Sequence, residues 1–356
     1  MKKELLLATA LAGSLGLAGT ANAVTMSMSG HHEVGIEGES PDGTGVDSTA
    51  RSGGGSGFAI SLSETTDGGI GISSGFSLMN ESTGFSNSNS GLTLTFTDGS
   101  KMDLVGAGNA SDSHDVAIPA SAGSEGIAYT ATNAAPGGID GLATGGDAVG
   151  FEWHSAADAM GVDGMKFSVS GSFNGDATTH TGNSTAVVDT GYAVGVTYVT
   201  TAGDTSVTVG AGYSSASLNN SNATKDENNG QIGISATTGD LTVAAGYANG
   251  DKVKDGSTDD EVEINDNAVS KIGVKYVAGD VTLSVGYSTG AGKDSTTLGT
   301  AGSSEDAVDT TQAGISYAVA SGVTANIGWK DVDSQEAGVS ETSGGTAWYI
   351  GANLAF

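Results

Sequence analysis

The feature that most constrains this chain is a side-chain alternation with a period of two residues, repeated in one hairpin after another. In the clearest copy, Lys271 to Tyr276 alternates, a short turn at Val277 to Asp280 follows, and Val281 to Tyr287 alternates back. Further copies surround the turn glycines Gly203, Gly239 and Gly322. Each turn contains a glycine that can take a positive φ, as tight hairpins require. The pattern predicts an all-β fold of antiparallel strands.

Pairs of glycine and an aromatic residue mark the returning strands and show which connections vary in length. The pairs Gly212-Tyr213, Gly246-Tyr247, Gly286-Tyr287 and Gly328-Trp329 recur every 34, 40 and 42 residues while the turns stay short. The variable length therefore falls in polar loops at the other end of the hairpins. Short turns at one end and long loops at the other are typical of a transmembrane up-and-down β-barrel. Over the whole chain the alternating segments number about sixteen, an even number, as such barrels require.

The last eleven residues, Thr346 to Phe356, form one more alternating segment. Trp348, Ile350 and Leu354 share one face with the terminal Phe356. An aromatic residue at the very end of a strand suits a ring that lies at a membrane boundary. We expect this strand to close the barrel.

The amino terminus has the organisation of a secretory signal peptide. Lys2 and Lys3 precede an apolar run from Leu5 to Ala18, and Ala21-Asn22-Ala23 fits an A-x-A cleavage site. The apolar run is shorter than the ~18 to 20 residues of a membrane-spanning helix. We expect residues 1–23 to direct export through the Sec pathway and residues 24–356 to form a single barrel domain. Cysteine is absent, so no disulfide and no Cys-ligated metal is available.

The formal charge of −29 favours cations as partners and argues against nucleic acid. The leader carries a net +1 through Lys2, Lys3 and Glu4, so its removal leaves −30. The 59 glycines and the many polar residues would also fit a disordered chain, but the regular alternation favours folded strands.

The same alternation sorts lipid-facing from lumen-facing side chains. If Val281, Leu283 and Val285 face lipid, then Thr282 and Ser284 face inward. Extended to the other strands, this parity places charged wall residues in the lumen: Glu33, Glu37, Asp103, Glu152, Lys166, Lys271 and Lys275. The other inward residues are mostly small, and sixteen strands enclose an aqueous channel.

One connection, residues 109–146, is far longer than the rest and has no regular period. It would follow the fifth strand and be the third loop on the long-loop side. Loops of this length are usually functional or disordered.

Together, the leader, the sixteen strands, the long third loop and the terminal Phe356 make the chain similar to the general diffusion porins of Gram-negative bacteria. Met28-Ser-Gly30 and Thr65-Thr-Asp-Gly-Gly69 resemble their alphaproteobacterial branch. The resemblance implies an outer-membrane homotrimer, in contact with lipid and lipopolysaccharide, for passive diffusion of small hydrophilic solutes. It also implies that the third loop folds inward, with acids at a constriction opposite a basic wall. The corresponding acids here are Asp112, Asp115, Glu125 and Asp140, whereas the nearest basic candidate is Arg51, placed in the first long loop.

These observations favour a cation-preferring pore over two alternative interpretations. A Gly-rich surface adhesin or a structural outer-membrane protein without channel activity is the main alternative. A barrel enzyme is not expected, because none of the five histidines has a Ser or Asp at a spacing that forces a dyad, and no cofactor is expected. The acidic outer loop at Asp255, Asp259, Asp260 and Glu261 is a candidate for weak structural Ca²⁺ or Mg²⁺ sites, although no EF-hand spacing is present.

Overall fold

The computed structural model describes residues 24–41, 49–53, 55–81, 84–104, 109–120, 149–173, 187–219, 224–255, 261–293, 305–335 and 342–356. The expected signal peptide, residues 1–23, lies outside the described residues, so it stays a prediction. Among the described residues there is no helix with the length and apolar character needed to span a membrane.

The described chain is almost entirely β-strand, with two short 3-10 helices, η1 (Asp112–His114) and η4 (Ala159–Gly161). The strands are β1 (Thr25–Pro41), β2 (Thr49–Gly53), β3 (Ser56–Thr65), β4 (Gly71–Glu81), β5 (Gly84–Thr95), β6 (Lys101–Leu104), β7 (Val149–His154), β8 (Met165–Phe173), β9 (Val187–Ala202), β10 (Thr205–Asn219), β11 (Thr224–Thr238), β12 (Leu241–Asp255), β13 (Glu261–Ala278), β14 (Val281–Lys293), β15 (Glu305–Ala320), β16 (Val323–Gln335) and β17 (Thr342–Ala355).

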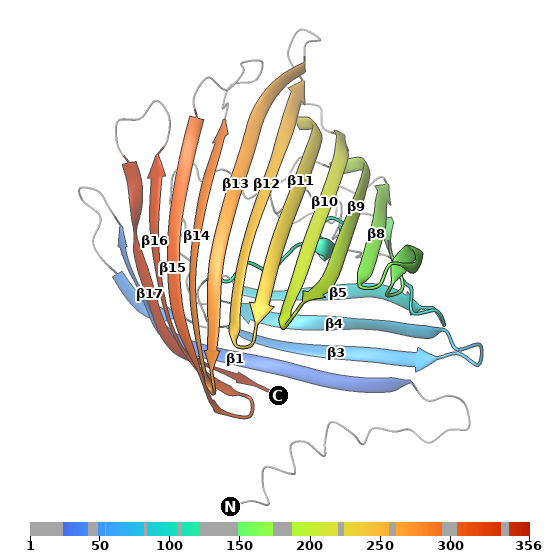
Figure 1. Cartoon of the computed structure of the whole chain (residues 1–356), viewed down its shortest axis with the longest axis horizontal. Helices are drawn as coiled ribbons and strands as arrows, with labels where there is room; N and C mark the ends of the chain where they lie inside the picture. The colour runs from blue at the N-terminus through green and yellow to red at the C-terminus, as the bar shows by residue number, and fades with distance from the viewer. Residues whose placement is uncertain are drawn as a thin grey trace, which may run out of the picture.

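All the strands belong to one antiparallel sheet that closes on itself, because β1 pairs with β17 as well as with β3. Each of the other strands pairs with its neighbours in the chain, so the strands lie side by side around the wall (Figure 1). The carboxyl terminus lies beside β1, where Phe356 exchanges two backbone hydrogen bonds with Gly30 at 3.0 and 3.1 Å. The expectation that the terminal strand closes the barrel is confirmed.

The segments β2 and β3 occupy the same edge of β1 in one continuous register and count as a single strand around the barrel. Gly35 pairs with Gly53 in β2, and His32 pairs with Ser56 in β3. The barrel therefore has sixteen strands, as predicted. Arg51 was expected in the first long loop, and this was wrong: it lies in β2, opposite Glu37. The 17-residue β1 continues past its pairing with β3 and so binds β2 as well.

The short turns take the predicted conformation. Gly203, Gly239, Gly279 and Gly322 have φ between 57° and 77°. By contrast, the strands extend well beyond their predicted limits toward the long loops, and β13 alone has 18 residues. The alternation of residues 271–276 marked only the last part of β13, and the earlier part, which is rich in Glu, Asp and Asn, was not predicted.

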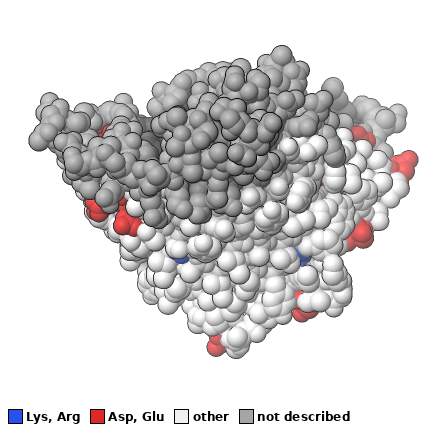
Figure 2. Space-filling model, turned by 90° about the horizontal axis from the view of Figure 1, so that it is seen from above, with Lys and Arg blue, Asp and Glu red and all other residues white. Residues whose placement is uncertain are grey.

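The predicted parity holds around the barrel. Leu283 and Val285 in β14 are 41% and 54% exposed on the outer face, whereas Ser284 between them is buried on the inner face. The outward aromatics named above, including Tyr213, Tyr247 and Tyr276, are all exposed. In the view of Figure 2 the described surface is almost entirely free of charge, with Asp and Glu toward its edges. An outer surface of this kind suits contact with lipid.

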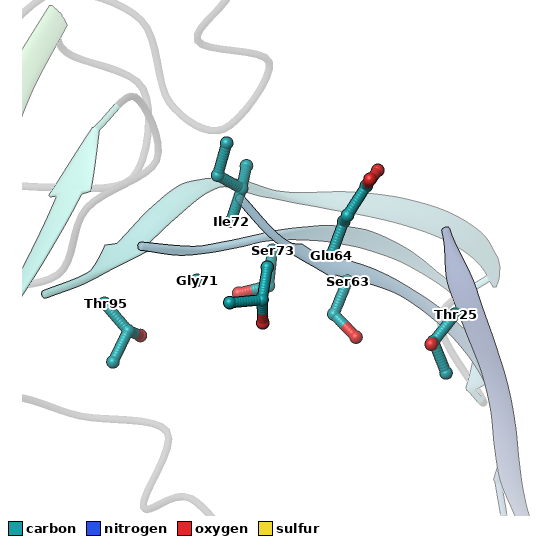
Figure 3. A pocket seen from close by; sticks show the side chains of 8 residues that line it. Thr25, Ser63, Glu64, Gly71, Ile72, Ser73 and Thr95 are labelled. Carbon is teal, nitrogen blue, oxygen red and sulfur yellow. The ribbon is translucent and has the colours of Figure 1, made fainter. Parts of the chain in front are cut away.

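On β1 and β3 to β5 the inner wall carries hydroxyl groups. Thr25, Ser63, Ser73 and Thr95 line a hollow of about 480 Å³ close to the short turns. In Figure 3 these four side chains point to one side of the sheet, and Glu64 and Ile72 point to the other. This part of the wall offers small polar groups to the lumen.

Candidate pore constriction

The first part of the long connection after β6, residues 109–120, lies against the inner wall of the barrel. Its short helix η1 is seen within the curve of the sheet, close to β9 and β10 (Figure 1). His114 and Val116 are buried toward the wall, whereas Asp112 and Asp115 are exposed. This segment therefore presents acids to the lumen while its other side chains pack on the strands.

A lane of inward-facing glycines makes room for the segment. Cross-strand partners along the lane include Gly195 with Gly212, Gly210 with Gly233, and Gly273 with Gly286. A Cβ atom placed on Gly273 would lie 1.7 Å from the carbonyl oxygen of Pro119, and one on Gly195 would lie 2.2 Å from that of Ala110. Since real Cβ atoms do not approach so closely, only glycine permits this contact between the loop backbone and the wall. The remaining members of the lane, Gly210, Gly212, Gly233, Gly246 and Gly286, contact residues between Ser111 and Ala120.

Hydrogen bonds fix the segment along the lane. The Ala110 amide donates to Ser170 Oγ in β8 at 3.1 Å, and Gln231 Nε2 in β11 donates to the Ser111 carbonyl at 2.7 Å. Ser113 Oγ donates to Glu152 Oε1 in β7 at 2.6 Å. The loop is thus anchored to three strands that are distant in sequence.

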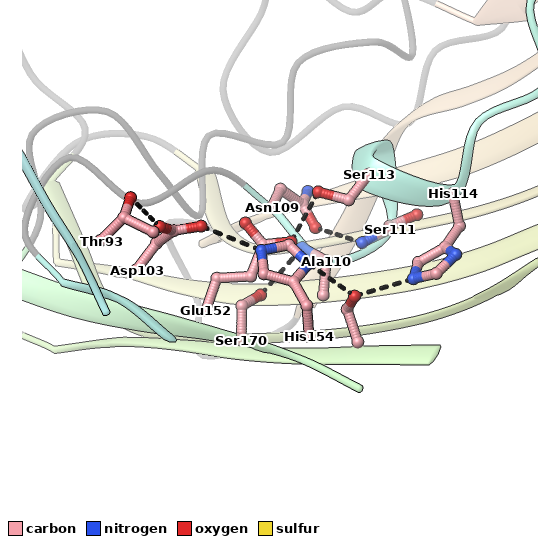
Figure 4. Close-up of polar contacts among 11 residues, drawn as sticks. Thr93, Asp103, Asn109, Ala110, Ser111, Ser113, His114, Glu152, His154 and Ser170 are labelled. Atoms are coloured by element: carbon pink, nitrogen blue, oxygen red, sulfur yellow. Dashed lines mark hydrogen bonds and ion pairs between the residues drawn. The ribbon is translucent and has the colours of Figure 1, made fainter. Parts of the chain in front are cut away.

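The fourth anchor is His114, whose ring is the first member of a chain of hydrogen bonds along the wall (Figure 4). His114 Nδ1 lies 2.7 Å from Thr197 Oγ1, and its Nε2 lies 2.8 Å from Ser168 Oγ. Ser168 Oγ is also 2.9 Å from Nδ1 of His154. His154 Nε2 is 3.0 Å from Asp103 Oδ2, and Thr93 donates to the other oxygen of Asp103.

The carboxylate of Asp103 sets the direction of this chain when both imidazoles are neutral. A carboxylate only accepts, so His154 Nε2 carries the proton and Nδ1 accepts from the Ser168 hydroxyl. The Ser168 oxygen then accepts from His114 Nε2, and His114 Nδ1 accepts from the Thr197 hydroxyl. Each group in the chain is satisfied with His114 in its neutral form.

The surroundings of His114 also favour the neutral imidazole. Burial, followed by the charges of His154 and Lys166, lowers the pKa of His114 from its ordinary value of 6.5. The docked loop therefore holds a neutral ring near neutral pH.

Comparison with known proteins identifies the barrel. The sequence model of the Gram-negative porin family matches residues 8–337. The chain belongs to the Gram-negative porin family.

As a member of this family, the protein is an outer-membrane channel. No curated protein matches the sequence. Among solved structures, a porin refined at 1.8 Å resolution is 18% identical over 93% of this chain and all of its own, with a TM-score of 0.60. The anion-selective porin of Comamonas acidovorans is 13% identical over 94% of this chain and all of its own, with a TM-score of 0.63. A trimer form of OmpT from Vibrio cholerae is 14% identical over 94% of this chain and 99% of its own, with a TM-score of 0.60. At these identities the likeness supports the shared fold.

The structure brings some of the expected site residues of this porin together and leaves others outside the described chain. Asp112 and Asp115 are exposed on the inward segment, and their role as constriction acids stays a prediction. Outside the described chain lie Glu125 and Asp140, and the side chains of Arg51, Asp255, Asp259, Asp260 and Glu261.

The expected wall charges all belong to inward positions, but they differ in accessibility. Glu33, Glu37 and Glu152 are buried, and Asp103 is bound to His154. Lys166, Lys271 and Lys275 are exposed to the lumen, as is Lys101. The described wall of this porin therefore carries both signs of charge.

Sequence reasoning missed the glycine lane and the pairing of His114 with Ser168. The lane had a detectable signal, because Gly212, Gly246 and Gly286 are the glycines of the recurring Gly-aromatic pairs. The histidine chain had none, because Ser168 is 54 residues from His114 and 14 from His154.

The contacts of Ser168, His154 and Asp103 resemble the connectivity of a hydrolase triad, but their setting differs. Ser168 is only 2% exposed, and its hydroxyl lies between two imidazoles. A nucleophile needs an open face toward a substrate, and this hydroxyl is covered by the docked loop. In this porin the three residues support the loop.

Proposed function

We propose that this porin is a passive channel for small hydrophilic solutes and ions and that it prefers cations. The supporting observation is the exposure of Asp112 and Asp115 on a segment that lies inside the barrel. Acids in a narrow aqueous passage raise the local concentration of cations and repel anions. We assign the preference to these loop acids, because the described wall carries charges of both signs.

The fold by itself does not set ion preference. The Comamonas acidovorans porin has a similar fold and is anion-selective. Selectivity in this family therefore has to be argued from the residues that line the passage. Glu125, Asp140 and Arg51 are further candidates, proposed on the resemblance alone.

The proposal is tested by the reversal potential of the purified protein in a planar bilayer under a salt gradient. We expect a cation preference that falls in the double variant Asp112→Asn, Asp115→Asn. The matched control is Asp204→Asn with Asp240→Asn, which removes the same charge from two exposed short turns. Anion preference in the wild type, or an equal change in the control, would refute the assignment. A barrel that inserts without conducting would favour the structural outer-membrane protein.

We also propose that the porin assembles as a trimer surrounded by outer-membrane lipid and lipopolysaccharide. The two chain ends form one apolar outer patch, because Ile36 pairs with Ile350 and His32 pairs with Leu354 across β1 and β17. Val34, Ile36, Ile350 and Leu354 are all exposed there. The trimer form of the Vibrio cholerae protein supports the same stoichiometry. Native mass measurement should give three chains, and Ile36→Glu should lower the trimer fraction.

Weak divalent cation sites on the outer loop around Asp255 to Glu261 are a further proposal, supported by the density of acids in that segment. Chelator should then lower the thermal stability of the oligomer, and unchanged stability would refute the proposal.

A further inference from the structure

We propose that Asp103, Glu152 and His154 form a lumenal binding site for a divalent transition metal ion, with Zn²⁺ as the probe. One ligand atom from each residue lies within 4.8 Å of the other two. His154 Nε2 is 3.0 Å from Asp103 Oδ2 and 3.8 Å from Glu152 Oε1. One imidazole nitrogen and two carboxylate oxygens are a donor set that Zn²⁺ and its neighbours in the first transition row accept.

Strand register creates the cluster. Asp103 in β6 pairs directly with Glu152 in β7, and His154 follows two residues later on the same inward face. Because all three are on adjacent strands of a closed sheet, their backbones are held before any ion binds. Only small side-chain movements would bring the three atoms to the ~2 Å ligand distances of a zinc site.

A second, independent observation is the charge of Glu152. Its side chain is 3% exposed, and the described residues offer it the Ser113 hydroxyl and the His154 imidazole, but no lysine or arginine. A buried carboxylate is normally paired with a cation or bound to a metal. A divalent ion at this position would supply the missing positive charge.

The second ring nitrogen of His154, Nδ1, is hydrogen-bonded, as is usual for a histidine that binds a metal through its other nitrogen. Nδ1 is hydrogen-bonded to Ser168 Oγ, which fixes the ring orientation from behind. If every hydrogen bond of the chain reverses, His154 Nδ1 donates to Ser168, Ser168 donates to His114 Nε2, and His114 Nδ1 donates to Thr197. The proton on His154 Nε2 is then replaced by one on Nδ1. The metal-binding nitrogen becomes available without a net loss of protons and without breaking the anchor of the loop.

The site can be reached from the lumen. Asp103 and His154 line a hollow of about 630 Å³ beside the docked loop. Lys101 and Lys166 line the same hollow, and their charges oppose a cation. We therefore expect moderate affinity, with selectivity for Zn²⁺ over Mg²⁺ that depends on the imidazole nitrogen.

Metal binding would act on the channel, because Glu152 also holds Ser113 of the constriction segment. An ion at this site adds two positive charges at the residue that holds Ser113, the neighbour of Asp112 in the chain. We expect Zn²⁺ to lower the cation conductance.

The test is isothermal titration of untagged, folded protein with Zn²⁺ in excess Mg²⁺, which occupies the exposed acidic sites. We expect one saturable site in the wild type and at least about a tenfold loss of affinity in His154→Gln, the size of effect typical for loss of a ligand or its support. His31→Gln removes an inward imidazole outside the cluster and should bind Zn²⁺ as the wild type does.

Two results would overturn the proposal: no saturable Zn²⁺ site in the wild type, or equal affinity in His154→Gln. If His154→Gln fails to assemble, Asp103→Asn gives the same comparison, and heat-modifiable migration reports which variants are folded. Because the readout is binding, its outcome is separate from the ion preference proposed above.

Discussion

The carbonyl oxygen of Pro119 lies 1.7 Å from the point where a Cβ atom on Gly273 would stand. The constriction segment and the wall of β13 are therefore in contact through their backbones. This closeness makes the position of the loop sensitive to a single methyl group on Gly273.

Gly273→Ala should displace the constriction segment and change the single-channel conductance while leaving the barrel closed. Overpacking of this kind costs about 1 to 3 kcal/mol, which the loop can relieve by moving off the wall. Gly246→Ala is the matched control, because its Cβ would lie 3.4 Å from the flexible end of Ile118, an ordinary contact. Equal conductance in Gly273→Ala and the wild type would show that the loop does not depend on the lane.

Docking of the loop through His114 should weaken in acid. The undocked ring titrates near 6.5, whereas the docked ring has a lowered pKa. The undocked state therefore binds more protons as the pH falls below about 6.5, and docking loses stability until the lowered pKa is passed. Above about 6.5 docking is at full strength.

The charged or titratable groups that act on His114 are His154 and Lys166 from the wall. Asp112 and Asp115 are on the same segment and are exposed away from the wall. Single-channel recording should show larger current fluctuations at about pH 5 than at about pH 8. His114→Asn should remove this dependence, because its amide does not titrate in that range. A pH response unchanged in His114→Asn, or one lost equally in His31→Asn, would contradict the role of His114.

Labelling of single cysteines should separate lumen from lipid, since the chain has no cysteine of its own. Lys275 is exposed on the inner face of β13, and Val274 beside it is exposed on the outer face. A membrane-impermeant thiol reagent should react with Lys275→Cys in outer-membrane vesicles and leave Val274→Cys unmodified. The reverse result would invert the assignment of the two faces.

A charge on the outer face of β14 should destabilise the barrel. Val285→Arg places a guanidinium where the side chain is 54% exposed and meets lipid, at a cost of about 2 to 4 kcal/mol near the midplane. Ser288→Arg is the control, because Ser288 faces inward on the same strand. Urea unfolding in lipid vesicles should show a lower midpoint for Val285→Arg alone, and equal midpoints would count against a lipid-facing Val285.

Much of the barrel could be predicted from the sequence because the patterns that specify its strands and turns extend over only a few neighbouring residues. The alternation around Leu283 follows from having lipid on one face of the strand and water on the other. The turn at Gly279 follows from the positive φ that a tight hairpin requires. Neither depends on a distant contact. The first part of β13, residues 261–270, was not predicted, because the strand was delimited by the alternation of residues 271–276.

The segment expected at the constriction could be identified from the sequence, but its contacts with the wall could not be predicted. The length of the connection after Gly108 marked it as unusual, and the resemblance to the general diffusion porins implied that it folds into the lumen. Which wall residues it binds depends on the register of strands far away in the chain, and a one-residue shift would turn Ser168 outward.

The sequence by itself determined the barrel, its closure at Phe356 and the face on which the residues of its alternating segments lie, because period-two alternation and turn chemistry act over a few residues. Only the tertiary structure decided that Pro119 lies on Gly273, that His114 and His154 share Ser168, and that Asp103, Glu152 and His154 converge. These contacts form only when the sixteen strands pair in their registers and the barrel closes. Closure brings together residues whose separation in the chain follows no repeat.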